Sequence, residues 1–172
     1  HMAVMYANAL YKRGFIKEGY KVLKNLLDSA MDFENSIMYP GIPEYFDNDG
    51  RGLYAYLTGA ASWYMLTMIT EVFGVRGELG NLVIKPALLP EQFDKDGKAA
   101  IKLNFSGRTL KITIHADIDN IQDNNGVYNK IIRVECDGNE LESADLKKVV
   151  IMKKRIEEMS CGRCHEIDVF IK

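Results

Sequence analysis

The stretch Tyr54-Ala-Tyr-Leu-Thr-Gly-Ala-Ala-Ser-Trp63 leads from an irregular segment into an apolar run, residues 60–73, that contains no helix breaker. This run predicts a buried helix that ends at Gly74. Thr58 stands just before the run, and threonine is a favoured N-cap residue. We therefore expect Thr58 to cap the helix, and the free N–H groups of the first turn could then meet an anion. The residues alone favour a plain cap over an anion site.

The composition is that of a globular protein. The 172 residues are 47% hydrophobic and 27% charged, which suits one domain of good size or two small ones. A net charge of −2 gives no electrostatic reason to expect nucleic acid or a membrane as a partner. No apolar run approaches the roughly 20 residues of a transmembrane helix. Three cysteines make no disulfide framework, so we expect a cytoplasmic protein.

The beginning of the chain indicates a piece of a longer protein. His1-Met2 resembles a remnant of an expression vector and contains no export signal. The helical pattern starts at residue 3 without a capping residue before it. We therefore expect a truncated segment.

Two helices are expected before the central run, at residues 3–11 and 16–33, separated by Gly14. Apolar residues of the second helix recur at three- and four-residue spacing, which predicts one buried stripe. The chain holds too few other helices to cover both members of such a helical hairpin. The stripe consists of Tyr20, Leu23, Leu27 and Met31.

The connector at residues 35–55 is unusually long and rich in aromatic residues interleaved with Glu, Asp and Arg. Aromatic side chains argue against disorder. Two interpretations stay open: a sugar pocket, in which flat rings stack on the sugar and carboxylates bind its hydroxyl groups, or an ordered loop that packs its own aromatics.

From Gly77 onward the pattern changes to short alternating segments, which predict a small antiparallel β-sandwich. Turn signals lie at Ser106-Gly-Arg108 and at Asp137-Gly138. The polar stretch 117–126 is interpreted as a solvent loop, because Asp117-x-Asp119 lacks the Gly and Glu of a calcium loop. Strands are expected at residues 81–85, 99–105, 109–116, 129–136, 149–152 and 165–171, with one or two helical turns at 153–159.

No pair of residues stands out as nucleophile and base. His115 and His165 lie in strand patterns, which favours surface or packing roles, and no glycine-rich nucleotide loop is present. Glu44 with Asp47 or Asp49 could form a carboxylate pair, but loop spacing cannot set the separation that acid–base catalysis needs.

The stretch Cys161-Gly-Arg-Cys-His165 matches the attachment pattern of c-type haem. It could also supply three zinc ligands, with Cys136 or His115 as the fourth. The absence of an export signal and of further ligand spacing favours a third interpretation, a turn that carries two thiols, and we expect no metal.

Three blocks resemble the C-terminal part of glycoside hydrolase family 94, which includes the cellobiose, cellodextrin, chitobiose and 1,2-β-oligoglucan phosphorylases. The run Leu82-Val-Ile-Lys-Pro-Ala-Leu88 and the Phe-Ser-Gly-Arg turn at 105–108 are also similar to that family. The resemblance covers almost the whole chain. The blocks are Gly41-Ile-Pro-Glu-Tyr-Phe46, Gly50-Arg-Gly-Leu-Tyr-Ala-Tyr-Leu-Thr-Gly-Ala-Ala-Ser-Trp63 and Glu71-Val-Phe-Gly-Val-Arg-Gly77.

The resemblance implies an α+β chain: residues 1–76 as the last helices and substrate loop of an (α/α)6 barrel, and residues 77–172 as the β-sandwich. It implies inverting phosphorolysis, a glycosyltransferase-type activity of carbohydrate metabolism. Phosphate would attack a β-glucoside, an Asp would protonate the leaving oxygen, and α-glucose 1-phosphate would form. Thr58 and Gly59 match the family's phosphate contact. The Asp acid lies upstream of this chain in the family, so the chain alone is expected to be inactive.

The resemblance implies a β-linked gluco-oligosaccharide and inorganic phosphate as ligands, with no cofactor. Glu44, Tyr45 and Arg51 lie in the matched loop and are candidates for the sugar site. Ile42 stands where cellobiose-type members usually carry Gln, which favours a 1,2-β-oligoglucan-like or an uncharacterised branch over cellobiose phosphorylases. A homodimeric parent, a non-catalytic carbohydrate-binding or assembly module, and a processing module of a cyclic β-1,2-glucan synthase stay open as alternatives.

Overall fold

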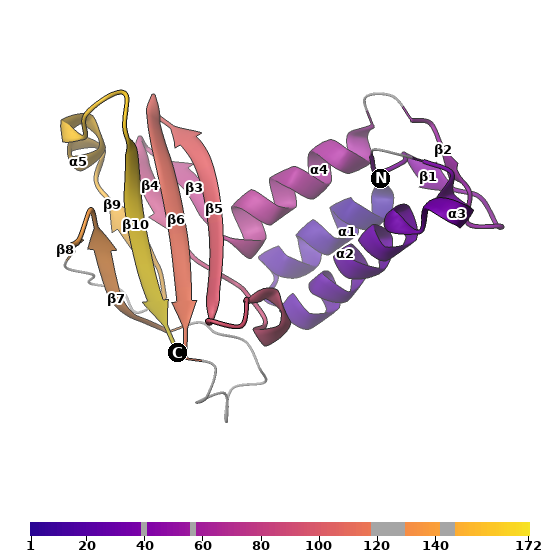
Figure 1. The fold of residues 1–172 in the computed structure, drawn as a ribbon, viewed down its shortest axis with the longest axis horizontal. Helices are drawn as coiled ribbons and strands as arrows, with labels where there is room; N and C mark the ends of the chain where they lie inside the picture. Colours follow the sequence, from indigo (N-terminus) through magenta and orange to yellow (C-terminus); the bar gives the residue numbers. More distant parts are fainter. Residues whose placement is uncertain (39–40, 56–57, 118–129, 142–146) are drawn as a thin grey trace. The chain divides into compact units, whose positions relative to one another are not determined.

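The structure, a computed structural model, describes residues 1–38, 41–55, 58–117, 130–141 and 147–172. The chain is mixed α+β and forms two compact units, His1–Glu71 and Val72–Lys172 (Figure 1). The boundary expected after residue 76 lies five residues beyond the observed one, since 76 − 71 = 5. The expected solvent loop at 117–126 falls, apart from Asp117, outside the described residues.

The first unit is built on the helices α1 (Met2–Lys12), α2 (Ile16–Met31) and α4 (Gly59–Thr67). The two helices expected near the start are confirmed, with Gly14 at φ 84° in the turn between them. The expected continuation to residue 33 is wrong, because the chain breaks at Asp32 and forms a separate short helix, α3 (Phe33–Ser36).

Close helix packing defines the core of the first unit. A Cβ built on Gly19 of α2 would lie 2.6 Å from the Tyr11 ring of α1, so only glycine allows this approach. The buried Asn8 side chain donates to Thr67 Oγ1 of α4 at 3.1 Å. The run expected as one helix at 60–73 instead changes after Thr67 to a π-helical turn, Met68–Val72.

The long connector contains a hairpin that the sequence did not indicate. Strand β1 (Tyr45–Phe46) pairs with β2 (Gly52–Leu53) in antiparallel register. Asp47 holds its turn by accepting from the Asp49 N–H at 3.0 Å and the Arg51 N–H at 2.9 Å. Residues 45–53 of the connector therefore form a hairpin with an Asx-type turn.

The second unit contains two sheets. The smaller sheet has the order β3 (Val75–Glu78), β4 (Asn81–Ile84) and β9 (Val149–Ile151). The larger sheet has the order β5 (Lys98–Phe105), β6 (Arg108–Ala116), β10 (Cys164–Ile171), β7 (Ile131–Cys136) and β8 (Asn139–Glu140). The smaller sheet lies behind the larger one in Figure 1, and β9 leads into α5 (Lys153–Glu158).

All six expected strands are confirmed within two residues at each described end. The expectation of a purely antiparallel arrangement is wrong, because β10 runs parallel to β6 along its whole length. Alternation along β6 and β10 buries one face of the larger sheet. Its buried side chains include Leu110, Ile112, Ile114, His165, Ile167, Val169 and Ile171.

The β3–β4 hairpin is a further element that sequence patterns missed. Its turn is made by Leu79 at φ 52° and Gly80 at φ 85°, and Leu79 is fully exposed. The two expected turns have the same geometry, with Ser106 at 48° and Gly107 at 74°, and Asp137 at 50° and Gly138 at 76°. A leucine in this position gives no turn signal.

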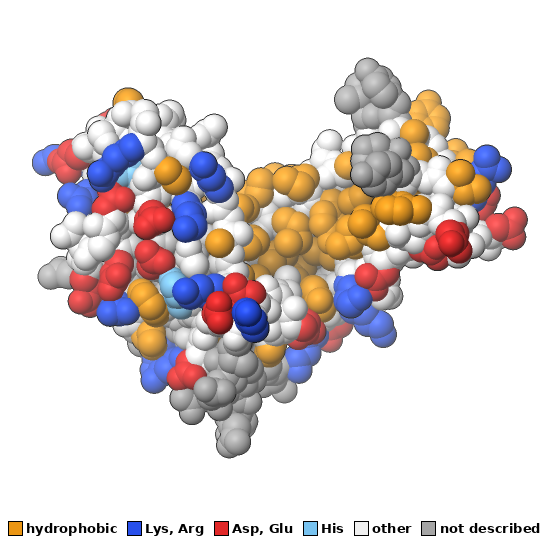
Figure 2. Space-filling model, viewed as in Figure 1, with side chains coloured by type: hydrophobic (Ala, Val, Ile, Leu, Met, Phe, Trp, Pro, Cys, Tyr) orange, Lys and Arg blue, Asp and Glu red, His pale blue; other side chains and the backbone are white. Residues whose placement is uncertain are grey.

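Many large apolar side chains of the first unit are exposed, and Figure 2 shows them gathered over its helices. The expected apolar stripe of α2 is only partly buried: Leu23 is 2% exposed, but Leu27 is 37% and Met31 58% exposed. Other examples are Met2, Met5, Tyr6, Phe15, Met65 and Leu66. Among the described residues, no helix is long and apolar enough to cross a bilayer.

Gly74→Ala should lower the free energy of unfolding by at least about 3 kcal/mol. Gly74 has φ 67°, and a Cβ there would lie 1.8 Å from the Lys85 carbonyl oxygen. Gly107→Ala is the matched control in the same unit, because φ is also positive but no atom lies within 4 Å. It should cost only about 1 kcal/mol. Equal losses in urea unfolding would contradict this account of Gly74.

Candidate functional site

Thr58 caps α4, as the sequence predicts. Its backbone is extended, with φ −69° and ψ 135°, and its hydroxyl oxygen accepts from the Ala61 N–H at 3.1 Å. The same hydroxyl donates to the Ile42 carbonyl oxygen at 2.8 Å, and Thr58 is only 7% exposed. The Thr58 side chain thus hydrogen-bonds both the connector and the first turn of α4.

The carboxylate of Glu44 lies at the start of α4. Its Oε2 accepts from the Ala60 N–H at 3.1 Å, and its Oε1 is 2.6 Å from His1 Nδ1. The expectation that the first-turn N–H groups are free is therefore wrong for Ala60 and Ala61. The physical reason is that N–H groups at a helix start need partners, and the Glu44 carboxylate and the Thr58 hydroxyl supply them. The position nevertheless accepts a negative charge, as the helix dipole favours.

Gly59 lies directly under the His1 ring. A Cβ at residue 59 would be 2.4 Å from the ring, a contact that a shift of the His1 side chain would relieve. The terminal ammonium of His1 also donates to the Glu44 carbonyl oxygen at 2.8 Å. Only the Glu44 carboxylate is counted as part of the helix start that Thr58 and Gly59 form, because His1 resembles a vector remnant.

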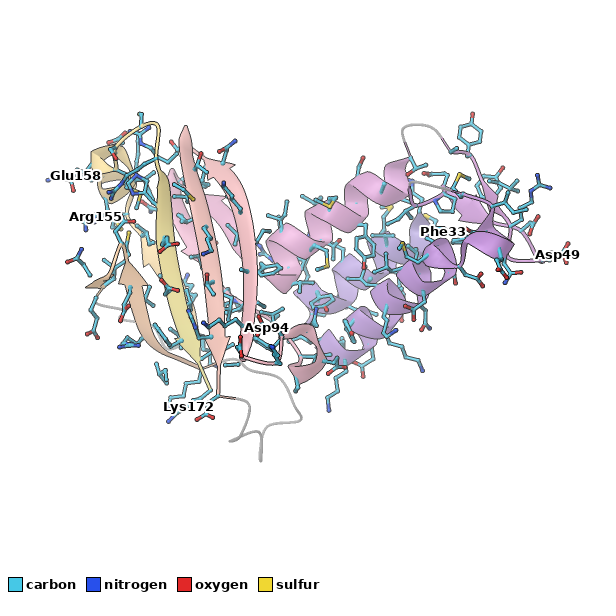
Figure 3. The ribbon with its side chains drawn as sticks, in the orientation of Figure 1. Phe33, Asp49, Asp94, Arg155, Glu158 and Lys172 are labelled. Carbon is cyan, nitrogen blue, oxygen red and sulfur yellow. The ribbon has the colours of Figure 1, made fainter. Side chains whose placement is uncertain are left out.

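The candidate sugar-site residues are only partly brought together. Glu44 and Tyr45 line a cavity of about 480 Å³ with Pro43, Phe46 and residues 1–3. Arg51 lies across the hairpin and is exposed, and it does not line this cavity. Asp49 lies at the outer end of the same hairpin (Figure 3). The Asp47 carboxylate accepts the hydrogen bonds of the turn, one of them from the Asp49 N–H. The carboxylate pair with Glu44 that the sequence left open is not observed among these contacts.

Tyr54 begins the stretch that leads into α4, but it was not among the candidate site residues. It adopts φ 67° and is 70% exposed, and Tyr45 is 52% exposed. A left-handed, exposed tyrosine is costly, and such strain is concentrated at functional positions. Of these two exposed tyrosines, Tyr45 lines the cavity and Tyr54 does not.

In the second unit, His165 is the centre of a buried polar cluster. It is 1% exposed; its Nδ1 lies 2.7 Å from Asp137 Oδ2 and its Nε2 lies 2.9 Å from the Ser160 carbonyl oxygen. Arg163 Nη2 donates to Asp137 Oδ2 at 2.6 Å, and the Glu166 N–H donates to Oδ1 at 3.0 Å. A ring with hydrogens on both nitrogens satisfies both His165 contacts.

The cluster lowers the pKa of Asp137. Partial burial alone would raise that pKa, but the hydrogen bond from His165, the Glu166 N–H and the charges of His165 and Arg163 outweigh burial. A cavity of about 530 Å³ beside the cluster is also lined by Arg155 and Glu158 of α5, which are labelled in Figure 3.

The side chains that the zinc interpretation requires do not come together among the described residues. Cys164 and His165 are neighbours on β10, so their side chains point to opposite faces. Cys136 is buried, and burial together with the Asp137 charge raises the pKa of its thiol against the opposing charges of Arg155 and Arg163. No three His, Cys, Asp or Glu side chains in the described part of the chain converge on a metal position.

His115 belongs to a second cluster, on the outer face of the larger sheet. His115 Nε2 is 2.7 Å from Asp168 Oδ1, and its ring stacks on Phe170 at 4.5 Å between centroids. Arg133 lies over the same phenyl ring, 4.0 Å from its centroid. Because β6 and β7 flank β10 on opposite sides, both faces of Phe170 are covered. No sequence pattern indicates this cluster, because it depends on strand register.

The chain matches no protein-family model, and no curated protein is found to be similar to it.

Asp137→Asn should lower the free energy of unfolding by about 1.5–3 kcal/mol at pH 6, because charge-assisted hydrogen bonds are lost. The folded-state pKa of Asp137 is lowered, so its stabilisation is present above about pH 4 and is lost as pH falls through the folded-state pKa. The difference between the two proteins should therefore shrink below pH 4 in urea unfolding.

Glu166→Gln is the matched control for this pH series. Its ion pair with Lys111 is exposed at 3.2 Å, so its removal should change stability by less than about 1 kcal/mol. A stability difference for Asp137→Asn that is the same at pH 3 and pH 6 would contradict the assigned role.

Proposed function

We propose that the chain is the C-terminal part of an inverting glycoside phosphorylase of the glycoside hydrolase family 94 type. The helices of the first unit would close an (α/α)6 barrel, and the sheets of the second unit would form the accompanying β-sandwich. The chain would contribute the start of α4 to the phosphate site. The Asp acid would come from the preceding part of the protein.

The observation that carries the proposal is the carboxylate of Glu44 at the start of α4. A carboxylate oxygen 3.1 Å from the Ala60 N–H occupies the position that a phosphate oxygen would take. Phosphate carries more charge and more acceptor oxygens, so it can replace Glu44 there. Thr58 could then turn its hydroxyl hydrogen from Ile42 to phosphate, because a hydroxyl rotates to suit its partner.

The exposed apolar surface of the first unit also supports the proposal. Met65 of α4 is 61% exposed and Tyr6 of α1 is 60% exposed, and other large apolar side chains of this unit are exposed as well. Figure 2 shows apolar side chains gathered over the helices. Apolar patches of this kind are normally covered in a soluble protein. The remaining helices of a barrel would provide that cover.

In the proposed reaction, phosphate attacks the anomeric carbon of a β-glucoside from the face opposite the leaving oxygen. The α4 start holds phosphate through backbone N–H groups, while the Asp acid protonates the leaving oxygen. The products are α-glucose 1-phosphate and a shortened glucan. The exposed rings of Tyr45 and Tyr54 are available to stack on sugar.

These exposed tyrosines also favour the second candidate function, a carbohydrate-binding or assembly module. Phe170 does not support it, since Arg133 and His115 cover both faces of its ring. Calorimetry of the chain with β-gluco-oligosaccharides distinguishes the two candidates. Micromolar binding that is lost in Tyr54→Ala would favour the module, and its absence favours the phosphorylase. A cyclic β-1,2-glucan synthase module would be distinguished by the sequence that precedes the chain.

Thr58→Val, made in the protein that contains this chain, should raise the KM for phosphate at least about tenfold in β-glucan phosphorolysis. Valine keeps the shape of threonine but removes the hydroxyl that organises the helix start. The KM for glucan should change little. The measurement is the release of α-glucose 1-phosphate against phosphate concentration.

Thr58→Ser is the control, because serine keeps the capping hydroxyl. It should retain a KM for phosphate within about threefold of the unchanged protein. Thermal unfolding separates the cap's contribution to stability, about 1 kcal/mol, from its role in binding. A Thr58→Val protein with an unchanged KM for phosphate would overturn the proposed site.

Glu44→Gln should lower the KM for phosphate about three- to tenfold, since the competing negative charge at Ala60 is removed. The variant retains the size and a hydrogen-bonding oxygen. Glu34→Gln, on the short helix α3, is a control that changes charge away from the α4 start. If Glu44→Gln raises the KM for phosphate, Glu44 assists binding and the displacement model is wrong.

A further inference from the structure

Two exposed thiols flank a short loop beside the buried His165 cluster. Cys161 and Cys164 are free and exposed, whereas Cys136 is free and buried. Only Gly162 and Arg163 separate the two exposed cysteines. The proposed phosphorolysis uses none of these residues.

The loop that carries the thiols is closed at its base by a hydrogen-bonding contact. His165 Nε2 lies 2.9 Å from the Ser160 carbonyl oxygen. Ser160 immediately precedes Cys161, and His165 immediately follows Cys164. The contact therefore connects the backbone before Cys161 to the side chain of the residue after Cys164.

The two residues inside the loop favour the same closure. Gly162 adopts φ 88°, which lets the chain reverse at no steric cost. The Arg163 side chain donates through Nη2 to Asp137 Oδ2 at 2.6 Å, which fixes its position. The loop ends are anchored on the buried ring of His165, while both thiols remain open to solvent.

We propose that Cys161 and Cys164 form a redox-active dithiol, which a low-molecular-weight disulfide of the glutathione type oxidises to an intramolecular disulfide. A disulfide requires Cα atoms about 4.4–6.8 Å apart, and the ends of a two-residue loop that reverses at Gly162 can come that close. The closed base gives each thiol a high effective concentration toward the other.

The low-molecular-weight disulfide takes up the electrons and protons that the two cysteines lose. The thiolate of one cysteine attacks a sulfur of the reagent, forms a mixed disulfide and releases one small thiol. The thiolate of the other cysteine attacks the protein sulfur of that mixed disulfide and releases the second small thiol. The cysteines lose two electrons and two protons, and the reagent gains both. Reduced reagent reverses the reaction, and exposure of the sulfurs makes the disulfide a labile one.

The experiment equilibrates the whole chain with mixtures of reduced and oxidised glutathione, followed by acid quenching, alkylation and mass analysis. We expect a species about 2 Da lighter, because two hydrogen atoms leave. Trypsin cleaves after Arg163, so the disulfide should join the peptides 156–163 and 164–172. Cys136 should remain reduced and become alkylated only after denaturation.

Single variants keep the proposal falsifiable. Cys161→Ser and Cys164→Ser should each yield only a mixed disulfide with glutathione, while Cys136→Ser should still form the joined peptides. His165→Phe removes the contact with Ser160 and should require a several-fold more oxidising glutathione ratio for half conversion. If His165→Phe does not fold, the cysteine variants still test whether Cys161 and Cys164 form the disulfide. Alkylation of both exposed cysteines at every ratio, mixed disulfides alone in the unchanged chain, or joining to Cys136 would each overturn the proposal.

Discussion

The hydroxyl group of Thr58 is the interaction on which the candidate site depends. It donates to Ile42 at 2.8 Å and accepts from the Ala61 N–H at 3.1 Å, so it joins the connector to the first turn of α4. That junction places Glu44, two residues after Ile42, against the Ala60 N–H. The connector thus brings its own negative charge to a helix start that would otherwise leave N–H groups unpaired. We interpret this self-occupied position as the place where phosphate binds.

The second unit is organised by a comparable constraint around one buried polar side chain. His165 connects the Asp137 turn and the Ser160 loop to strand β10. Arg108 of β6 adds hydrogen bonds to the Met159 carbonyl oxygen at 2.8 Å and the Glu157 carbonyl oxygen at 3.1 Å, which holds the end of α5. Loops from distant parts of the sequence are therefore fixed by polar contacts to two parallel strands. The exposed thiol pair lies at the edge of this network.

Local sequence signals predicted much of the fold. The cap at Thr58 and the turns at Ser106-Gly107 and Asp137-Gly138 each depend on residues within a few positions, so the sequence shows them directly. The β3–β4 turn was missed because Leu79 adopts a left-handed conformation that favours glycine or asparagine. The parallel pairing of β6 and β10 was missed because alternation gives a strand but not its neighbour or direction.

The candidate site was predicted less completely than the fold. The cap signal predicted the role of Thr58 at the start of α4, but no local pattern shows that Glu44 would turn toward Ala60. The contact of Asp168 with His115, and the stack of His115 on Phe170, depend on the register of β10 against β6. Such pairs become visible only when strand order is known. The sequence predicts free N–H groups at the start of α4, but the Glu44 carboxylate accepts from one of them. Under the proposed function, phosphate would therefore compete with Glu44 for that N–H group.

The most direct measurement of this competition is amide NMR of the chain during titration with inorganic phosphate at constant ionic strength. The account predicts saturable shifts of the Gly59 and Ala60 signals, larger in Glu44→Gln, and no comparable shifts at the start of α2, at Ile16 and Lys17. Chloride in place of phosphate should move none of these signals. Equal shifts at both helix starts, or none at Gly59 and Ala60 in either protein, would contradict the assignment of the α4 start as a phosphate site.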